Sequence, residues 1–150
     1  MARNDAGSVA GFRTARPAHC PAEDARACSQ WLAGLIAAGV RIVVPAVTDY
    51  ELRRELLRAR KSASIKRLDA LAHATEYLPL STAVMRQAAE LWAQARQQGQ
   101  PTAGDNTIDV DIILAAQALG LGTTDVVIAT ANVGHLSRFV PAESWQTIVP

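Results

Sequence analysis

The chain has 150 residues, 49% of them hydrophobic, and a formal net charge of +1 at pH 7. This length and composition predict one globular domain spanning residues 1–150 and exclude an intrinsically disordered chain. The near-neutral charge favours no strongly charged partner. No apolar run is long enough for a membrane-spanning helix, so we expect no membrane association.

Two cysteines, Cys20 and Cys28, are present and do not have CxxC spacing. They predict no disulfide framework, and the N-terminal residues lack the long apolar stretch of a secretory signal. A reducing, cytoplasmic setting is therefore expected.

The first half of the chain predicts a helix, a strand and two more helices. Apolar residues recur at helical spacing over 23–38, and the β-branched run VRIVV (40–44) predicts a strand. Pro45 then opens a helix that extends to about residue 57, and another helix follows from about Ser64.

The second half continues this alternation. A short strand is predicted within 76–81, and Ser81 can cap the long helix that follows. The helix over 108–122 is apolar nearly all round, which is typical of a buried helix. Strands are predicted at 124–131 and, as a last edge strand, at WQTIV (145–149). The alternation favours an α/β fold with a mostly parallel sheet flanked by helices.

Seven basic residues fall within a short span: Arg53, Arg54, Arg58, Arg60, Lys61, Lys66 and Arg67. Such a run attracts phosphates in some proteins. In others it is the solvated face of a helix. The sequence leaves both interpretations open.

Ligands of parallel α/β sheets bind beyond the carboxyl ends of the strands. The polar residues expected at that edge of the sheet are Asp5, Asp49, Glu51, Asp109, Asp111, Asn132 and His135. Asp111 precedes the buried helix and is either its cap, a role that Asp109 could also fill, or a ligand. Glu51 is either a surface ion-pair partner or a site residue at the strand end.

Clustered carboxylates suit Mg²⁺ or Mn²⁺, which are hard cations with oxygen ligands. Such a cation can activate water and neutralise charge on a scissile phosphate. The sequence contains no strong Ser-His-Asp or Cys-His pattern that would indicate another hydrolytic chemistry.

The order of these motifs resembles the PIN-domain family, notably the VapC-like toxin ribonucleases. Four segments carry the resemblance: DAGSV (5–9), VVPAVTDYELRREL (43–56), DIILAAQALGLG (111–122) and VVIATANVGHLSRF (126–139). Together they span most of the chain.

This resemblance implies a three-layer α/β fold and metal-dependent cleavage of RNA. It implies that Asp5, Glu51 and Asp111 are ligands of Mg²⁺ or Mn²⁺, and that Asn132 belongs to the catalytic group without adding charge. The implied partners are an RNA substrate, an antitoxin protein and a second copy of the chain.

Two features depart from the family pattern. Only the polar residues MARN precede Asp5, where an apolar first strand is usual, so the first strand is truncated or Asp5 is displaced. Asn132 replaces a fourth acid. The alternatives are a catalytically impaired PIN-like module that binds nucleic acid or protein, and a structural α/β domain in which Glu51 and Asp111 form salt bridges.

Overall fold

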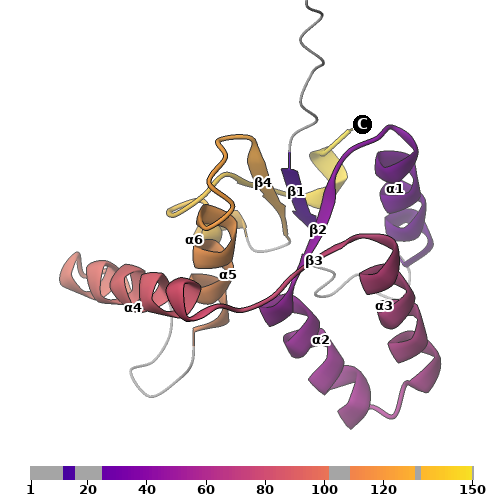
Figure 1. Ribbon diagram of the computed structural model, residues 1–150, viewed down its shortest axis with the longest axis horizontal. Helices are drawn as coiled ribbons and strands as arrows, with labels where there is room; N and C mark the ends of the chain where they lie inside the picture. Colours follow the sequence, from indigo (N-terminus) through magenta and orange to yellow (C-terminus); the bar gives the residue numbers. More distant parts are fainter. Residues whose placement is uncertain (1–11, 16–24, 102–108, 131–132, 150) are drawn as a thin grey trace, which may run out of the picture.

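Parallel strands form the centre of the computed structural model, which describes residues 12–15, 25–101, 109–130 and 133–149. The strands are β1 (Phe12–Ala15), β2 (Ile42–Pro45), β3 (Glu76–Leu78), β4 (Val126–Ala129) and β5 (Ala142–Glu143). The helices are α1 (Ala25–Ala37), α2 (Ala46–Arg58), α3 (Ser62–Ala74), α4 (Thr82–Gln97), α5 (Val110–Leu119) and α6 (Val133–Leu136), followed by the short 3₁₀ helix η1 (Trp145–Thr147). Figure 1 shows their arrangement.

The five strands make one sheet in the order β3-β2-β1-β4-β5, and every strand pairing is parallel. In the central strand, Thr14 is in register with Val43 of β2 and with Ile128 of β4. The predicted α/β fold with a parallel sheet is confirmed. Because all the strands run the same way, their carboxyl ends lie at one edge of the sheet.

Hydrophobic residues cover both faces of the sheet. On one face, Val126 and Ile128 of β4 belong to a core cluster that includes the buried residues of α5. On the other face, Ala129 packs with Leu35 of α1, and Val127 lies against the same cluster. Alternate residues of β4 therefore face opposite helical layers, as the period of two in a strand requires.

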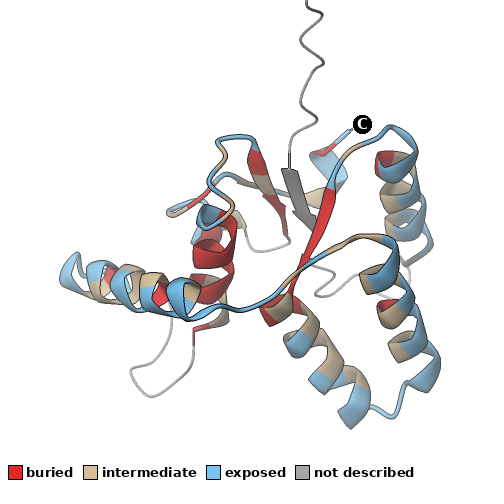
Figure 2. Cartoon of the chain, viewed as in Figure 1, coloured by how far each residue is buried: buried red, intermediate tan, exposed pale blue. Residues whose placement is uncertain are grey.

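The predicted burial of α5 is also confirmed. All seven residues from Ile112 to Ala118 are buried, and they form the largest continuous buried stretch of helix in Figure 2. By contrast, α2 is buried only where it leaves the sheet, and its far end is exposed. None of the helices in the described residues is both long enough and apolar enough to span a membrane.

Two details of the predicted strand order are wrong. The segment WQTIV is not a strand: η1 begins at Trp145, and the edge strand is β5, a few residues earlier. Trp145 instead makes an edge-to-face contact with Trp31, with 5.7 Å between ring centroids. Packing of a large aromatic ring thus overrides the local preference for a strand.

The first described strand also differs from the prediction. β1 begins at Phe12, so it follows Asp5 in the chain instead of preceding it. Its four residues, FRTA, include two polar ones and give no apolar run, which is why the sequence pattern did not identify it. Asp5 itself lies outside the described residues.

Candidate active site

The candidate site lies at the edge of the sheet where the parallel strands end. α2 begins at Ala46, immediately after β2, and α6 begins at Val133, shortly after β4. β1 lies between these two strands. Side chains that follow β2 and β4 therefore flank the carboxyl end of the central strand, which is the usual position for a ligand site in this architecture.

A buried glutamine holds the start of α2 in place. Gln117 of α5 is fully buried, and its Oε1 accepts a hydrogen bond from the backbone N–H of Val47 at 3.3 Å. Its Nε2 donates to the carbonyl oxygens of Leu78 (2.9 Å) and Pro79 (3.3 Å), just after β3. One side chain thus joins α5, the first turn of α2 and the end of β3. Glu51, which is partly buried and one helical turn beyond Val47, therefore projects from a fixed backbone.

Asp111 lies in the first turn of α5, but Asp109 is the helix cap. The Oδ1 of Asp109 accepts a hydrogen bond from the backbone N–H of Ile112 at 3.2 Å. The open question of which aspartate caps the helix is thereby decided. Asp111 lies in the same first turn and does not make this cap bond.

His135, which the sequence placed at this edge of the sheet without assigning it a role, lies beside Asp111. His135 Nδ1 of α6 is 3.7 Å from Asp111 Oδ2, and the two side chains are 52% and 16% exposed. This contact shows that the first turn of α5 lies next to α6, which follows β4. The sequence signal was only that a histidine comes soon after a strand, a pattern too common to single it out.

The described residues supply part of the predicted metal site. They include Glu51 and Asp111, but contain no group of three or more His, Cys, Asp or Glu side chains arranged to hold a metal ion. The other two predicted site residues, Asp5 and Asn132, lie outside the described residues. Glu51 and Asp111 still suit Mg²⁺ chemically, because this ion is often held by one or two carboxylates together with waters and substrate phosphates.

Two further polar residues are buried near the strand ends. Thr48, in the first turn of α2, is 1% exposed, and its Oγ1 makes no hydrogen bond within the described part of the chain. Thr130, directly after β4, is also 1% exposed, and its backbone N–H donates to the carbonyl oxygen of Glu143 at 2.9 Å. Thr48 therefore places a buried hydroxyl in the first turn of α2, the helix that carries Glu51.

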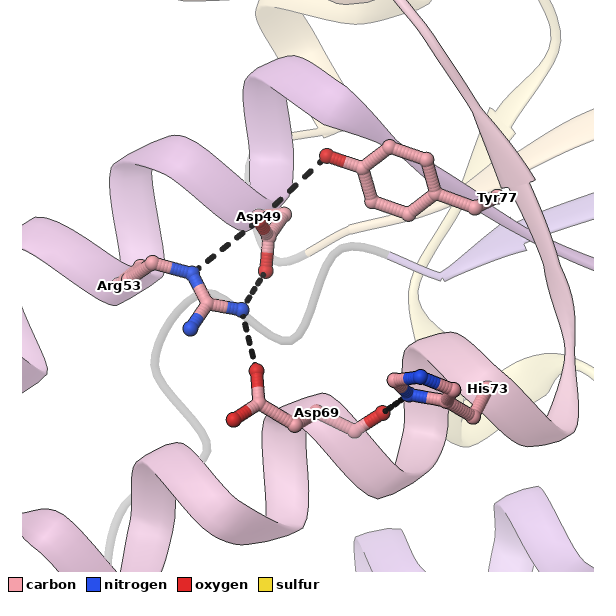
Figure 3. Close-up of polar contacts among 5 residues, drawn as sticks. All are labelled: Asp49, Arg53, Asp69, His73 and Tyr77. Atoms are coloured by element: carbon pink, nitrogen blue, oxygen red, sulfur yellow. Dashed lines mark hydrogen bonds and ion pairs between the residues drawn. The ribbon is translucent and has the colours of Figure 1, made fainter.

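The other two acids of α2 are held by arginines of the same helix. Glu55 pairs with Arg58 at 2.7 Å across one turn of the helix. Asp49 pairs with Arg53 at 2.9 Å, and Arg53 also reaches Asp69 of α3 at 2.8 Å. Figure 3 shows Arg53 between the two aspartates. The cluster links α2 to α3, so Asp49 has a structural role.

Tyr77 of β3 joins this cluster from the sheet. Its hydroxyl lies 3.5 Å from Asp49 Oδ2 (Figure 3). Burial raises the pKa of Tyr77, and the charge of Asp49 raises it further. The pKa of Arg53 is also raised, first by its hydrogen bond to Asp49 and then by that to Asp69, so the guanidinium stays charged. On the α3 side, His73 Nδ1 donates to the carbonyl oxygen of Asp69 at 2.7 Å.

Comparisons with known proteins identify the family and the fold of the chain. The sequence profile of the PIN domain matches residues 18–137. No curated protein matches the sequence.

Several solved structures share the fold. The structure of VapBC-1 from nontypeable Haemophilus influenzae is similar with a TM-score of 0.67 and 18% identity, over 91% of this chain and 98% of the other. VapBC2 from Rickettsia felis, bound to a DNA fragment from its promoter, gives a TM-score of 0.62 and 16% identity over 89% and 98% of the two chains. DNA-bound VapBC from Salmonella typhimurium gives 0.54 and 18% over 90% and 98%. At 16–18% identity, the similarity to these three structures shows a shared fold.

Proposed function

Because the chain belongs to the PIN domain family, we propose that it is a metal-dependent endoribonuclease of the toxin type. The observation that carries the proposal is the position of Asp111. Its carboxylate stands at the mouth of a buried helix that another residue already caps, and it faces a histidine from the segment after β4. A carboxylate in the first turn of a buried helix, at the edge of the sheet where the parallel strands end, is a suitable cation ligand.

In this proposal Asp5, Glu51 and Asp111 hold Mg²⁺ or Mn²⁺, and Asn132 orients the attacking water. When bound, the cation lowers the pKa of water and neutralises charge on the scissile phosphate. The chain orients the proposed ligands. Gln117 accepts a hydrogen bond from Val47 N–H in the first turn of α2, one turn before Glu51. His135 lies 3.7 Å from Asp111 and would be a neighbour of the bound cation's ligand.

Cleavage of a single-stranded RNA should be measured with Mg²⁺ or Mn²⁺ and with EDTA. Wild-type protein should cleave only with the cation, and Asp111→Asn should lower the rate by about 100-fold or more, because loss of one charged ligand weakens both metal binding and the site's electrostatics. Asp125→Asn is the matched control, since Asp125 is an exposed aspartate in the turn before β4. Equal cleavage by wild type and Asp111→Asn would overturn the assignment.

The VapBC names of the similar structures support a partner protein. We propose that an antitoxin-type protein binds this chain, and that the chain forms a homodimer. Two large apolar side chains of α2, Tyr50 and Leu57, are each 59% exposed and are seven residues apart, so they share one helical face. Such a face is a suitable contact for a partner.

A second function is supported by a specific observation. β1 follows Asp5 instead of ending at it, and position 132 is an asparagine where the family pattern has an acid. A PIN-like module with impaired catalysis that binds nucleic acid or protein would share these features. Calorimetric titration with Mn²⁺ separates the two functions, because the enzyme should take up the ion and the binding module should not.

A further inference from the structure

The turn that joins α2 to α3 contains an arginine in an unusual backbone conformation. Arg60 has φ = 54° and is the one residue other than glycine with a positive φ in the part of the chain that the structure describes. Its backbone N–H donates to Leu57 O at 3.0 Å, and the N–H of Lys61 donates to Leu56 O at 2.9 Å. This pair of bonds is the Schellman motif, which requires a left-handed residue just after the helix.

Two other helices of the chain end in the same motif with glycine at that position. After α1, Gly39 has φ = 75° and donates to Ile36 O. After α4, Gly99 has φ = 69° and donates to Arg96 O. Glycine adopts this conformation without steric strain, whereas a side chain with a Cβ does not. At the end of α2 the chain therefore carries arginine where glycine would be the more stable choice.

The surroundings of Arg60 are strongly basic. Residues 53–67 contain seven basic side chains and one acidic side chain, a net charge of +6, so the rest of the chain has eight basic and thirteen acidic residues and a net charge of −5. Arg60, Lys61 and Lys66 are exposed and form no ion pair with any residue that the structure describes. The positive charge of the molecule is thus concentrated at this turn.

This turn lies along α2 from the candidate site. In Figure 1, α2 leads away from the sheet and the α2–α3 connection lies at the bottom of the view, far from the sheet. Glu51, Arg54 and Arg58 share one helical face because they are three to four residues apart. The rise of a helix places Arg58 about 10 Å beyond Glu51, which is roughly three nucleotides of a stacked strand at about 3.4 Å each.

We propose that the basic turn, defined as Arg58–Lys61, binds the phosphate backbone of single-stranded RNA whose neighbouring nucleotides reach the candidate site. The proposal rests on the proposed function for its choice of RNA as the partner. Guanidinium groups suit phosphates because their planar N–H forks match the oxygens in pairs. Arg60 adopts the left-handed conformation at a cost in stability that glycine would avoid, and its exposed side chain adds one positive charge to the turn.

The test is fluorescence anisotropy with a labelled single-stranded RNA in EDTA, so that binding is measured without cleavage. Arg60→Gly should weaken binding about 3-fold and reduce the slope of log affinity against log salt by about 0.7, the value for one lost phosphate contact. The Tm of this variant should stay the same or rise by about 2 °C, because backbone strain is removed. Arg60→Lys should retain most of the affinity, because it retains the charge.

Arg86→Gln is the matched control, because Arg86 is an exposed arginine on α4 whose replacement removes the same charge. It should leave the affinity unchanged. The proposal is overturned if Arg60→Gly binds RNA with unchanged affinity and salt slope, if both variants lose affinity equally, or if duplex DNA of the same sequence binds more tightly than the RNA. A protein that loses RNA affinity on Arg60→Gly but never cleaves RNA would contradict the proposed catalysis and keep this inference.

Discussion

The two ends of α2 differ in burial, charge and backbone conformation. At the sheet end, Val47 and Thr48 are buried, and Gln117 binds the first turn. At the far end, Arg58 has a side chain that is 76% exposed, and Arg60 adopts a left-handed backbone. One end of the helix is built for rigidity and the other for presenting charge to solvent. In the proposed function, this one helix connects the candidate site at the sheet to the proposed RNA-binding turn.

The largest effect on stability is expected at the sheet end. Gln117→Leu should lower the free energy of unfolding by about 3 kcal/mol, because it leaves the Val47 N–H and the Leu78 carbonyl buried without this partner. Urea denaturation measures the change. Gln94→Leu, at an exposed position of α4, is the control and should change stability little. A loss below about 1 kcal/mol for Gln117→Leu would mean that the glutamine does not fix α2.

A smaller loss is expected in the middle of α2. Arg53→Met should cost about 1–2 kcal/mol, because Asp49 and Asp69 lose their shared partner, a value reduced by the partial exposure of all three groups. Arg67→Met removes an exposed arginine of α3 that bonds only to a serine hydroxyl among the described residues, and it should cost less. If the two variants have the same urea midpoint, the cluster does not stabilise the α2–α3 pair.

Thr48 offers a substitution with the opposite sign. Thr48→Val replaces a buried hydroxyl that has no partner in the described residues with a methyl group of similar size, so stability should rise by about 1 kcal/mol. Thr48→Ser keeps the hydroxyl and should not share the gain. Thermal unfolding with EDTA present measures both. A lower Tm for Thr48→Val would show that the hydroxyl is bound in solution.

The smallest expected effect is the change in folding stability with pH that Tyr77 causes. Because the pKa of Tyr77 is raised above its ordinary value of about 10, folding keeps its phenol neutral. This contribution to stability is complete below pH 10 and is lost as the pH rises through the higher pKa of the folded state. The ultraviolet absorbance of tyrosinate in a Tyr50→Phe variant follows Tyr77 alone, since the chain has two tyrosines. Asp49→Asn should lower this pKa, and an unchanged value would exclude Asp49 as a cause.

The strands differ in how clearly the sequence predicts them. β2 and β4 were predicted because strands covered on both faces read as apolar runs. β1 was not, because FRTA gives no such pattern, although it is the central strand. Its position is determined by pairing with both neighbours, which are distant in the chain. The failure at WQTIV has a related cause, since contact with Trp31 decides the conformation of Trp145.

For the candidate site, the sequence identified residue types more readily than roles. Glu51 and Asp111 were selected because each lies near an element boundary and at a position that the family resemblance matches. The cap role of Asp109, however, depends on one backbone geometry. The Gln117 bonds join residues 39 and 70 positions apart, so no local pattern could indicate them. A single polar residue inside an apolar helix was the available signal.

The contact between α1 and the C-terminal segment has a consequence for synthesis of the protein. Trp31 Nε1 donates to the carbonyl oxygen of Ile148 at 2.8 Å, across 117 residues, and Ile148 completes the core on the α1 side of the sheet. The α5-side cluster ends by residue 142, so a chain that ends at Ser144 contains all of its residues. Hydrogen exchange on a chain ended at Ser144 should protect α5 more than α1. A product of premature termination at Ser144 is therefore expected to keep every residue of one hydrophobic layer and to leave Leu35 of the other exposed.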